Sequence, residues 1–194
     1  MIKTKSLCVY CGSRMPRDPA HIDAAKTLGT ALATHGIRLV YGGGHVGLMG
    51  IIADATLDAG GQVIGIIPAH LHDIEVGHKK LTELHVVDSM HTRKAKMFEM
   101  SDAFAVLPGG LGTLDETFEM ITWRQIGLHD KPVLLVNHHD YWRPLLDLVE
   151  HMIGAGFAEP EAREYFTVVS NLADIIPALT REPEAEINPD ISKF

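Results

Sequence analysis

Residues 38–59 read RLVYGGGHVGLMGIIADATLDA, in which a short apolar run, a glycine-rich turn and a segment with helical spacing follow one another. Five glycines lie within the nine residues Gly42–Gly50. A strand that passes through a tight turn into a helix is the repeating unit of parallel α/β sheets, and ligands bind at such turns. The stretch therefore predicts a strand at Arg38–Tyr41, a helix at Leu48–Ala59 and a ligand-binding turn between them.

The same alternation of strands and helices continues through most of the chain. The apolar runs are continuous, as expected for strands that are covered on both faces. We therefore expect one Rossmann-like, doubly wound α/β domain over residues 1–180, with helices on both faces of a parallel sheet, and a loose tail over residues 181–194. The other strands are expected at Ser6–Tyr10, Gln62–Ile67, Glu83–Val87, Ala103–Leu107, Pro132–Asn137 and Thr167–Ser170, and the other helices at Ala20–His35, Met90–Ser101, Leu114–Leu128, Tyr141–Ile153 and Leu172–Leu179.

Charge and composition disfavour several classes of protein. The 194 residues include 17 Lys and Arg against 25 Asp and Glu, for a net charge of -8, so we expect no nucleic-acid partner. The apolar runs are far shorter than the roughly 20 residues of a membrane helix, so we expect no membrane partner. Met1–Tyr10 lacks the pattern of a secretory signal, and the single pair Cys8 and Cys11 is too few to staple such a domain. Both observations favour the reducing cytoplasm.

A second glycine-rich turn, PGGLGTLDE at residues 108–116, follows the expected strand Ala103–Leu107 and opens another helix. Glycines allow backbone N–H groups to approach an anion, and a helix N-terminus adds donors that have no partner within the helix. The turn lacks the Gly-Lys-Ser/Thr of a P-loop. The second strand ends at Tyr41 rather than at the acidic residue of a dinucleotide site, which disfavours a nicotinamide oxidoreductase. Two such turns at strand ends favour a nucleotide or sugar-phosphate ligand.

Glu116 has two interpretations that the sequence leaves open. Thr113 and Glu116 have the spacing of a capping box, in which the carboxylate would fold back onto the Thr113 N–H. A carboxylate beside a phosphate-binding turn is repelled by the ligand, however, so a purely structural position has an electrostatic cost. If Glu116 instead faces a ribose, it would stabilise positive charge as a glycosidic bond breaks, or polarise a water.

The segment Asp88–Met97 predicts another helix start, capped by Ser89 or Asp88. Arg93 and Lys94 then lie in the second turn, near the positive end of the helix dipole, where a cation is mildly disfavoured. A bound anion would relieve this repulsion. The alternative is a solvated basic face on an acidic protein, and the sequence does not decide between the two.

The remaining polar residues point to ligand binding rather than to covalent or metal chemistry. Ser13, in the turn Cys11–Arg14, lacks the Gly-x-Ser-x-Gly surroundings of a nucleophile, so we expect it to donate a hydrogen bond to a ligand. The 12 histidines include no His-Glu-x-x-His motif, and we expect no metal site. The segment Ala69–Thr82 is long for a connection and is a candidate lid.

The chain combines Cys11-Gly12-Ser13, Tyr41-Gly42-Gly43-Gly44, Met90-x-x-Arg93-Lys94 and Pro108-Gly109-Gly110-Leu111-Gly112-Thr113-x-x-Glu116. With these motifs, the region Ser6–Phe157 resembles the LOG ("Lonely Guy") family of cytokinin riboside 5′-monophosphate phosphoribohydrolases, whose members are often mislabelled as possible lysine decarboxylases. No lysine has the position of a pyridoxal-phosphate Schiff base, so decarboxylation is not expected.

The resemblance implies a homodimeric, Rossmann-like hydrolase that splits purine nucleoside 5′-monophosphates, AMP included, into free base and ribose 5-phosphate without a metal or other cofactor. It places the catalytic pair on Arg93 and Glu116, with the amides of Gly109–Thr113 on the phosphate. The alternative is a non-catalytic module of the same fold that binds or senses a nucleotide. Motifs and resemblance together predict these substrate contacts: Gly12, Ser13, Gly43, Gly44, Met90, Lys94, Gly109, Gly110, Leu111, Gly112, Thr113, Leu114, Asp115 and Thr122.

Overall fold

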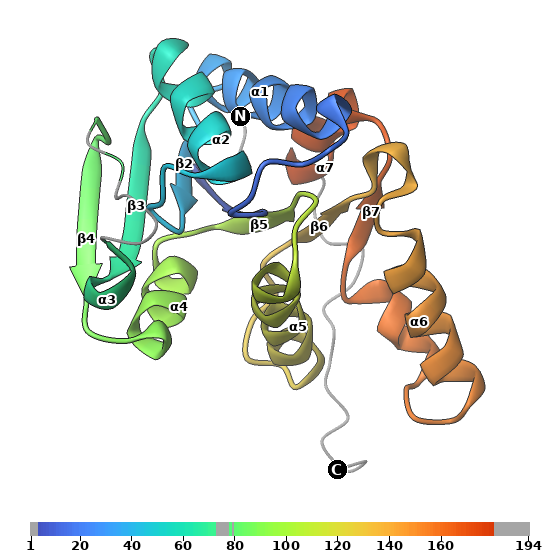
Figure 1. Ribbon diagram of the computed structural model, residues 1–194. Coiled ribbons are helices and arrows are strands. Elements are labelled where there is room, and N and C mark those ends of the chain that lie inside the picture. Colours follow the sequence, from blue (N-terminus) through green and yellow to red (C-terminus); the bar gives the residue numbers. More distant parts are fainter. Residues whose placement is uncertain (1–3, 73–77, 79, 181–194) are drawn as a thin grey trace.

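The computed structural model describes residues 4–72, 78 and 80–180, whose strands form one parallel sheet in the order β4-β3-β2-β1-β5-β6-β7 (Figure 1). The strands are β1 (Ser6–Tyr10), β2 (Arg38–Tyr41), β3 (Val63–Pro68), β4 (Glu83–Val87), β5 (Ala103–Val106), β6 (Val133–Val136) and β7 (Thr167–Val169). The α-helices are α1 (Pro19–Thr34), α2 (Gly47–Asp58), α3 (Ala69–His72), α4 (Met90–Glu99), α5 (Leu111–Gln125), α6 (Arg143–Gly154) and α7 (Ile175–Thr180). The predicted α/β fold is confirmed.

The sheet grows outward from β1 in two directions. The chain first proceeds from β1 to β4, and it then returns to β5, which pairs with the free side of β1 and brings Tyr10 opposite Val106. Because all strands are parallel, the turn after β1 and both glycine-rich turns lie at the same edge of the sheet. The carboxyl ends of β1 and β5 form the switch point at which ligands bind in open α/β sheets.

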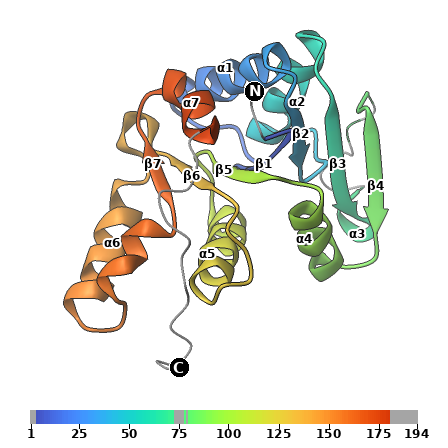
Figure 2. The ribbon, with the colours of Figure 1, turned by 180° about the vertical axis from the view of Figure 1, so that it is seen from behind.

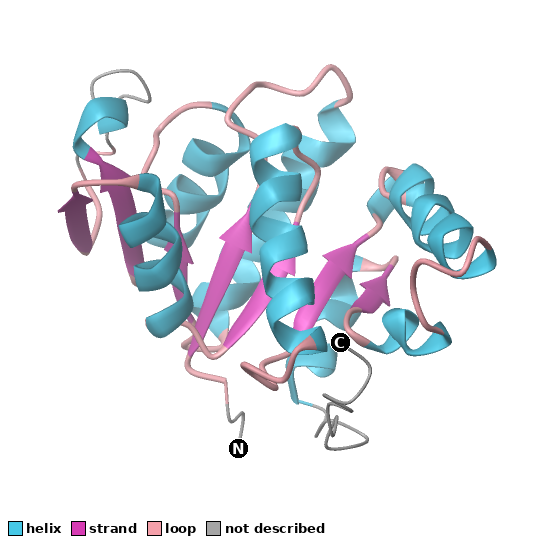
Figure 3. Cartoon of the chain, turned by 90° about the horizontal axis from the view of Figure 1, so that it is seen from below, coloured by secondary structure: helices cyan, strands magenta, loops and turns pink. Residues whose placement is uncertain are grey.

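Helices cover both faces of the sheet, as expected. The front and back views agree that α1, α2 and α7 lie on one face and α4, α5 and α6 on the other (Figure 1, Figure 2). The view from below looks onto the face of the sheet that α4, α5 and α6 cover, with helices in front of the strands (Figure 3). Successive strand residues point to opposite faces, so Leu7 and Val9 belong to the core under α1 and α2, whereas Cys8 and Tyr10 belong to the core shared with α4 and α5.

The start of α5 differs from the prediction. We expected the helix from Leu114, but it begins at Leu111 with Gly110 as its N-cap. The prediction took Thr113 as the cap, and Leu111, which is 86% exposed, gave no sign of a helix that starts earlier. Thr113 is therefore in the first helical turn, and Glu116 lies beyond the N3 position that a capping box requires. The capping-box interpretation of Glu116 is wrong.

Other differences are smaller. The expected helix Leu172–Leu179 is a 3-10 turn at Leu172–Asp174 followed by α7, and α6 begins at Arg143 because the proline after it suits a first helical turn. The candidate lid begins with α3, but its residues 73–77 and 79, like the expected tail 181–194, lie outside the described residues. None of the helices in the described part of the chain combines the length and the apolarity of a membrane span.

Candidate active site

A cavity of about 510 Å³ opens at the switch point, between the turn after β1 and the first turns of α4 and α5. Two more side chains reach it from α2 and α3. The predicted residues that line it are Gly12, Ser13, Met90, Arg93, Gly110, Leu111, Gly112, Thr113, Asp115 and Glu116. The lining residues outside the predicted set are Cys11, Arg14, Met49 and Leu71.

The four additional residues differ in how well the sequence could have predicted them. Cys11 and Arg14 flank Gly12 and Ser13 in the turn after β1, so their position at a strand end was a usable signal. Met49 lies in the first turn of α2, directly after the first glycine cluster. Leu71 had no local signal, because it reaches the cavity only through the folding of the segment after β3.

The N-terminus of α5 supplies hydrogen-bond donors to this cavity. Its N-cap Gly110 has no side chain, and the first bond within the helix runs from the Leu114 N–H to the Gly110 carbonyl at 3.0 Å. The N–H groups of residues 111–113 come before that bond, so helix geometry gives them no partner within α5. Together with the helix dipole, these amides suit a phosphate group.

The preceding Gly109 permits the close packing of this turn. A Cβ atom at residue 109 would collide with the Thr113 side chain, so any other residue would push that first helical turn away. Thr113 itself is 4% exposed, and its carbonyl accepts a hydrogen bond from the Thr117 hydroxyl at 2.6 Å. The second glycine turn is therefore held in the shape that exposes its amides to the cavity.

Arg93 enters the cavity from α4. The helix is capped by Ser89, whose Oγ accepts a hydrogen bond from the Thr92 N–H at 3.1 Å, as predicted. The guanidinium is buried, with 5% of the residue exposed, and its Nη2 donates to the Gly42 carbonyl at 2.9 Å. A Cβ at residue 42 would occupy the place of Nη2, so the first glycine turn makes room for this arginine. The structure excludes the solvated basic face for Arg93.

The Cys11 thiol reports on the electrostatics of the cavity. Burial raises its pKa, the negative charge of Glu116 raises it further, and the positive charge of Arg93 lowers it. Both charges therefore act on the same atom, and the thiol stays protonated near neutral pH. The charged residues that line the cavity are the carboxylates Glu116 and Asp115 and the guanidinium groups of Arg93 and Arg14, and the side chain of Asp115 is 60% exposed.

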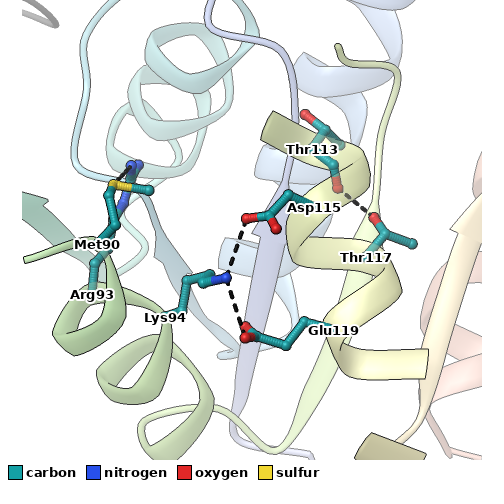
Figure 4. A network of polar contacts seen from close by, with 7 residues as sticks. All are labelled: Met90, Arg93, Lys94, Thr113, Asp115, Thr117 and Glu119. Atoms are coloured by element: carbon teal, nitrogen blue, oxygen red, sulfur yellow. Dashed lines mark hydrogen bonds and ion pairs between the residues drawn. The ribbon is translucent and has the colours of Figure 1, made fainter. Parts of the chain in front are cut away.

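Lys94 is a predicted substrate contact that lies beside the cavity, and its contact with substrate stays a prediction. Among the described residues it is not one of those that line the cavity, and its Nζ lies 3.2 Å from Asp115 Oδ2 and 3.2 Å from Glu119 Oε1 (Figure 4). Burial lowers the pKa of Lys94, but the hydrogen bonds to Glu119 and Asp115 outweigh it, and the net shift is upward. The sequence reasoning missed Glu119, although its spacing of four residues from Asp115 was visible.

Five other predicted contacts do not line this cavity. Gly43 and Gly44 lie in the first glycine turn, where the Gly43 carbonyl accepts the His78 N–H at 3.1 Å. Gly109 borders an adjacent cavity of about 390 Å³ that shares Gly12, Arg14 and Gly110 with the first one. Leu114 packs against the core, and Thr122 is exposed further along α5, roughly 16 Å from its start along the helix axis. For these residues, contact with substrate stays a prediction.

Three potential metal ligands do come together, although no sequence motif predicts them. The ligand atoms of His45, Asp54 and His78 lie within 4.8 Å of one another. His78 Nδ1 accepts the Lys80 N–H at 3.2 Å, so a neutral ring carries its proton on Nε2, which donates to Asp54 at 2.9 Å. These contacts connect His78 and Lys80 to α2, which carries Asp54.

Comparisons with known proteins identify the family and the fold of this chain. A family model described as possible lysine decarboxylase matches residues 49–179. A cytokinin riboside 5′-monophosphate phosphoribohydrolase of Rhodococcoides fascians is 47% identical over 176 residues, which are 90% of this chain and 89% of that protein. An Arabidopsis thaliana enzyme of the same name is 44% identical over 177 residues, 91% of this chain and 82% of that protein.

A solved structure supports the fold alone. The molybdenum cofactor binding protein of Rippkaea orientalis superposes with a TM-score of 0.66 at 22% identity, covering 91% of this chain and 96% of that one. The sequence relatives carry the assignment further, because they match nearly the whole chain at twice that identity. The chain belongs to the LOG family, the family whose model is described as possible lysine decarboxylase.

Proposed function

We propose that this protein hydrolyses the N-glycosidic bond of purine nucleoside 5′-monophosphates, both cytokinin riboside monophosphates and AMP, to the free base and ribose 5-phosphate. One observation carries the proposal: the amides at the start of α5, the carboxylate of Glu116 and the guanidinium of Arg93 line one cavity. The relatives named as cytokinin riboside 5′-monophosphate phosphoribohydrolases support the same substrate class.

The phosphate would bind at the N–H groups of residues 111–113, where backbone donors and the helix dipole favour a negative charge. Glu116 lies about 7 Å further along the axis of the same helix. A ribose held by its 5′-phosphate would therefore extend along the first turns of α5 toward the carboxylate.

Glu116 then has the position to act on the ribose. As the bond between C1′ and the base nitrogen breaks, its electron pair leaves with the base and positive charge develops on the ribose ring. The carboxylate would stabilise that charge or orient the water that adds to C1′, and the proton that this water loses balances the proton that the departing base gains. Arg93, held by the Gly42 carbonyl, would fix the ribose and Glu116 through its forked donors.

We further propose that the protein works as a homodimer in the cytoplasm, without a cofactor and without a nucleic-acid or membrane partner. The two cysteines support a reducing compartment, because both are free thiols buried in the fold. The homodimer rests on the family resemblance. Lysine decarboxylation is not supported, since among the described residues that line the cavity there is no lysine.

The test is to incubate the purified protein with AMP and with isopentenyladenosine monophosphate, and to measure the free base by chromatography. Adenosine serves as the matched control, because it lacks only the phosphate that the start of α5 would hold. We expect base from both monophosphates and at least about tenfold less from adenosine. If nucleotides bind but no purine or pyrimidine monophosphate yields base, the protein is a binding module and the hydrolase proposal is wrong.

A further inference from the structure

Helices α4 and α5 carry the two proposed catalytic side chains and are joined by a salt-bridge triad of one lysine and two carboxylates. Lys94 of α4 points between Asp115 and Glu119 of α5, with both N–O distances at 3.2 Å (Figure 4). Asp115 and Glu119 are four residues apart, so they lie on the same face of α5. Lys94 directly follows Arg93, and Asp115 directly precedes Glu116. These ion pairs therefore connect the part of α4 that carries Arg93 to the part of α5 that carries Glu116, the two side chains proposed to act on the ribose.

The exposure of the two carboxylates shows which one holds the lysine. The side chain of Lys94 is 17% exposed and that of Glu119 is 21% exposed, whereas that of Asp115 is 60% exposed. Solvent screens the attraction of an exposed partner, and exposed ion pairs contribute little. Glu119 is therefore the main partner, in agreement with the upward shift of the Lys94 pKa, to which its hydrogen bond contributes more than that of Asp115.

Resting on the function proposed above, we infer that Glu119 is a positioning residue for that reaction: through Lys94 it holds α4 against α5 and so sets the separation of Arg93 from Glu116. Lys94 acts within this pair and not on the substrate, since it lies outside the cavity lining. A catalytic pair displaced by about 1 Å can lose up to two orders of magnitude in rate. The loss falls on kcat, because the phosphate-binding amides belong to α5 and do not move with α4.

The kinetic test compares Glu119→Gln with wild type and with Glu150→Gln. Glu150 forms an ion pair with Arg163 on the surface, where both side chains are about half exposed. Glu150→Gln is therefore a matched substitution at a site away from the cavity. We expect Glu119→Gln to lower kcat at least about tenfold with KM within about twofold. Glu150→Gln should leave both constants unchanged. A normal kcat in folded Glu119→Gln would overturn the inference.

A second pair of variants separates positioning from direct substrate contact. Lys94→Met should reproduce the loss of kcat. The exchanged pair K94E/E119K retains a cation on α5, one turn from Asp115, and an anion on α4, so it should recover most of that loss. If Lys94 contacts substrate instead, Lys94→Met raises KM about tenfold or more and the exchange gives no recovery, which overturns the inference.

A spectroscopic readout makes the inference independent of the proposed reaction. The Trp123 ring of α5 packs edge-on against Phe98 of α4 with centroids 5.2 Å apart, so it senses the separation of the helices. In protein labelled with fluorotryptophan, Lys94→Met should shift the Trp123 resonance but not that of Trp142, and K94E/E119K should restore it. An unshifted Trp123 signal contradicts the positioning pair, whereas absence of base release by wild type contradicts only the proposed function.

Discussion

The turns at residues 42–47 and 108–110 each follow a buried strand and each lead into a helix, α2 and α5 respectively. In the first turn, the Gly42 carbonyl accepts from Arg93 and the Gly43 carbonyl accepts from His78, so its acceptors are used by other parts of the fold. In the second turn, Gly110 caps α5 and the first-turn amides border the cavity. Two glycine-rich turns of similar composition thus have different surroundings.

The difference lies in what packs in front of each helix. The turn after β1 covers the N-terminus of α2: the Leu48 N–H donates to the Gly12 carbonyl at 3.0 Å, and Gly47 lies so close to Ser13 and Arg14 that a Cβ there would be 2.5 Å from their backbone. The N-terminus of α5 faces the cavity instead. A glycine-rich turn therefore marks a place where another group can come close to the backbone. Whether that group is a ligand or another segment of the protein depends on how the rest of the chain packs around the turn.

The largest expected effect is at the helix that follows the second turn. Glu116→Gln keeps the size of the side chain but removes the charge that would stabilise the ribose, so we expect kcat/KM for AMP to fall about 10³-fold. Release of base by chromatography measures this loss, with circular dichroism as the check on folding. If the folded variant has full activity, Glu116 is not a catalytic residue, and the proposal that the second turn leads into the catalytic helix while the first does not is wrong.

The next effect tests the first turn. Gly42→Ala places a Cβ where Arg93 Nη2 now lies, so the arginine must move, and we expect kcat to fall about 100-fold with little change in KM. Gly154→Ala is the matched control, because a Cβ at that position of α6 meets no atom within 4 Å. Steady-state kinetics of both variants decide the point. A rise in KM alone for Gly42→Ala would mean that the first turn binds substrate directly.

A smaller effect is expected in the second turn, and it should fall on KM rather than on kcat. Gly109→Ala forces Thr113 away and distorts the amides of the first turn of α5, so KM for AMP should rise about tenfold while kcat changes less. Inhibition by ribose 5-phosphate should weaken in parallel. Unchanged KM together with lowered kcat would show that the second turn positions the catalytic groups instead of holding the phosphate.

The smallest effect concerns stability and lies away from both turns. Burial lowers the pKa of His129 below its ordinary 6.5, and its Nε2 donates to the Met120 carbonyl at 2.9 Å. Below about pH 6.5 the unfolded chain therefore binds a proton that the folded chain does not, so this stabilisation is complete above that pH and is lost as the pH falls. We expect Tm to decrease from about pH 7 to about pH 5. His129→Gln should show a shallower decrease by circular dichroism, and an identical profile would exclude His129 as a source.

Much of the fold followed from local pattern. All seven predicted strands occur. The five inner strands are buried and have the continuous apolar runs expected of strands covered on both faces, whereas the edge strands β4 and β7 are largely exposed. The start of α5 did not follow, since the exposed Leu111 carries no periodic signal and glycine is an inconspicuous cap. Of the predicted site, the residues at strand ends and helix starts came together at one edge, as parallel topology requires.

The positions that the sequence could not give depend on contacts between distant segments. Local order along the chain was sufficient for the parallel sheet and its ligand-binding edge, because strand, turn and helix signals are short-range. The candidate pair Arg93 and Glu116 rested on the family resemblance, since the local pattern left both residues with an alternative interpretation. Only the folded chain decided that α5 presents its amides while α2 does not, and that Lys94 meets Glu119 rather than the cavity. These outcomes depend on the packing of whole elements, where burial and shape select one of several arrangements that the local pattern allows.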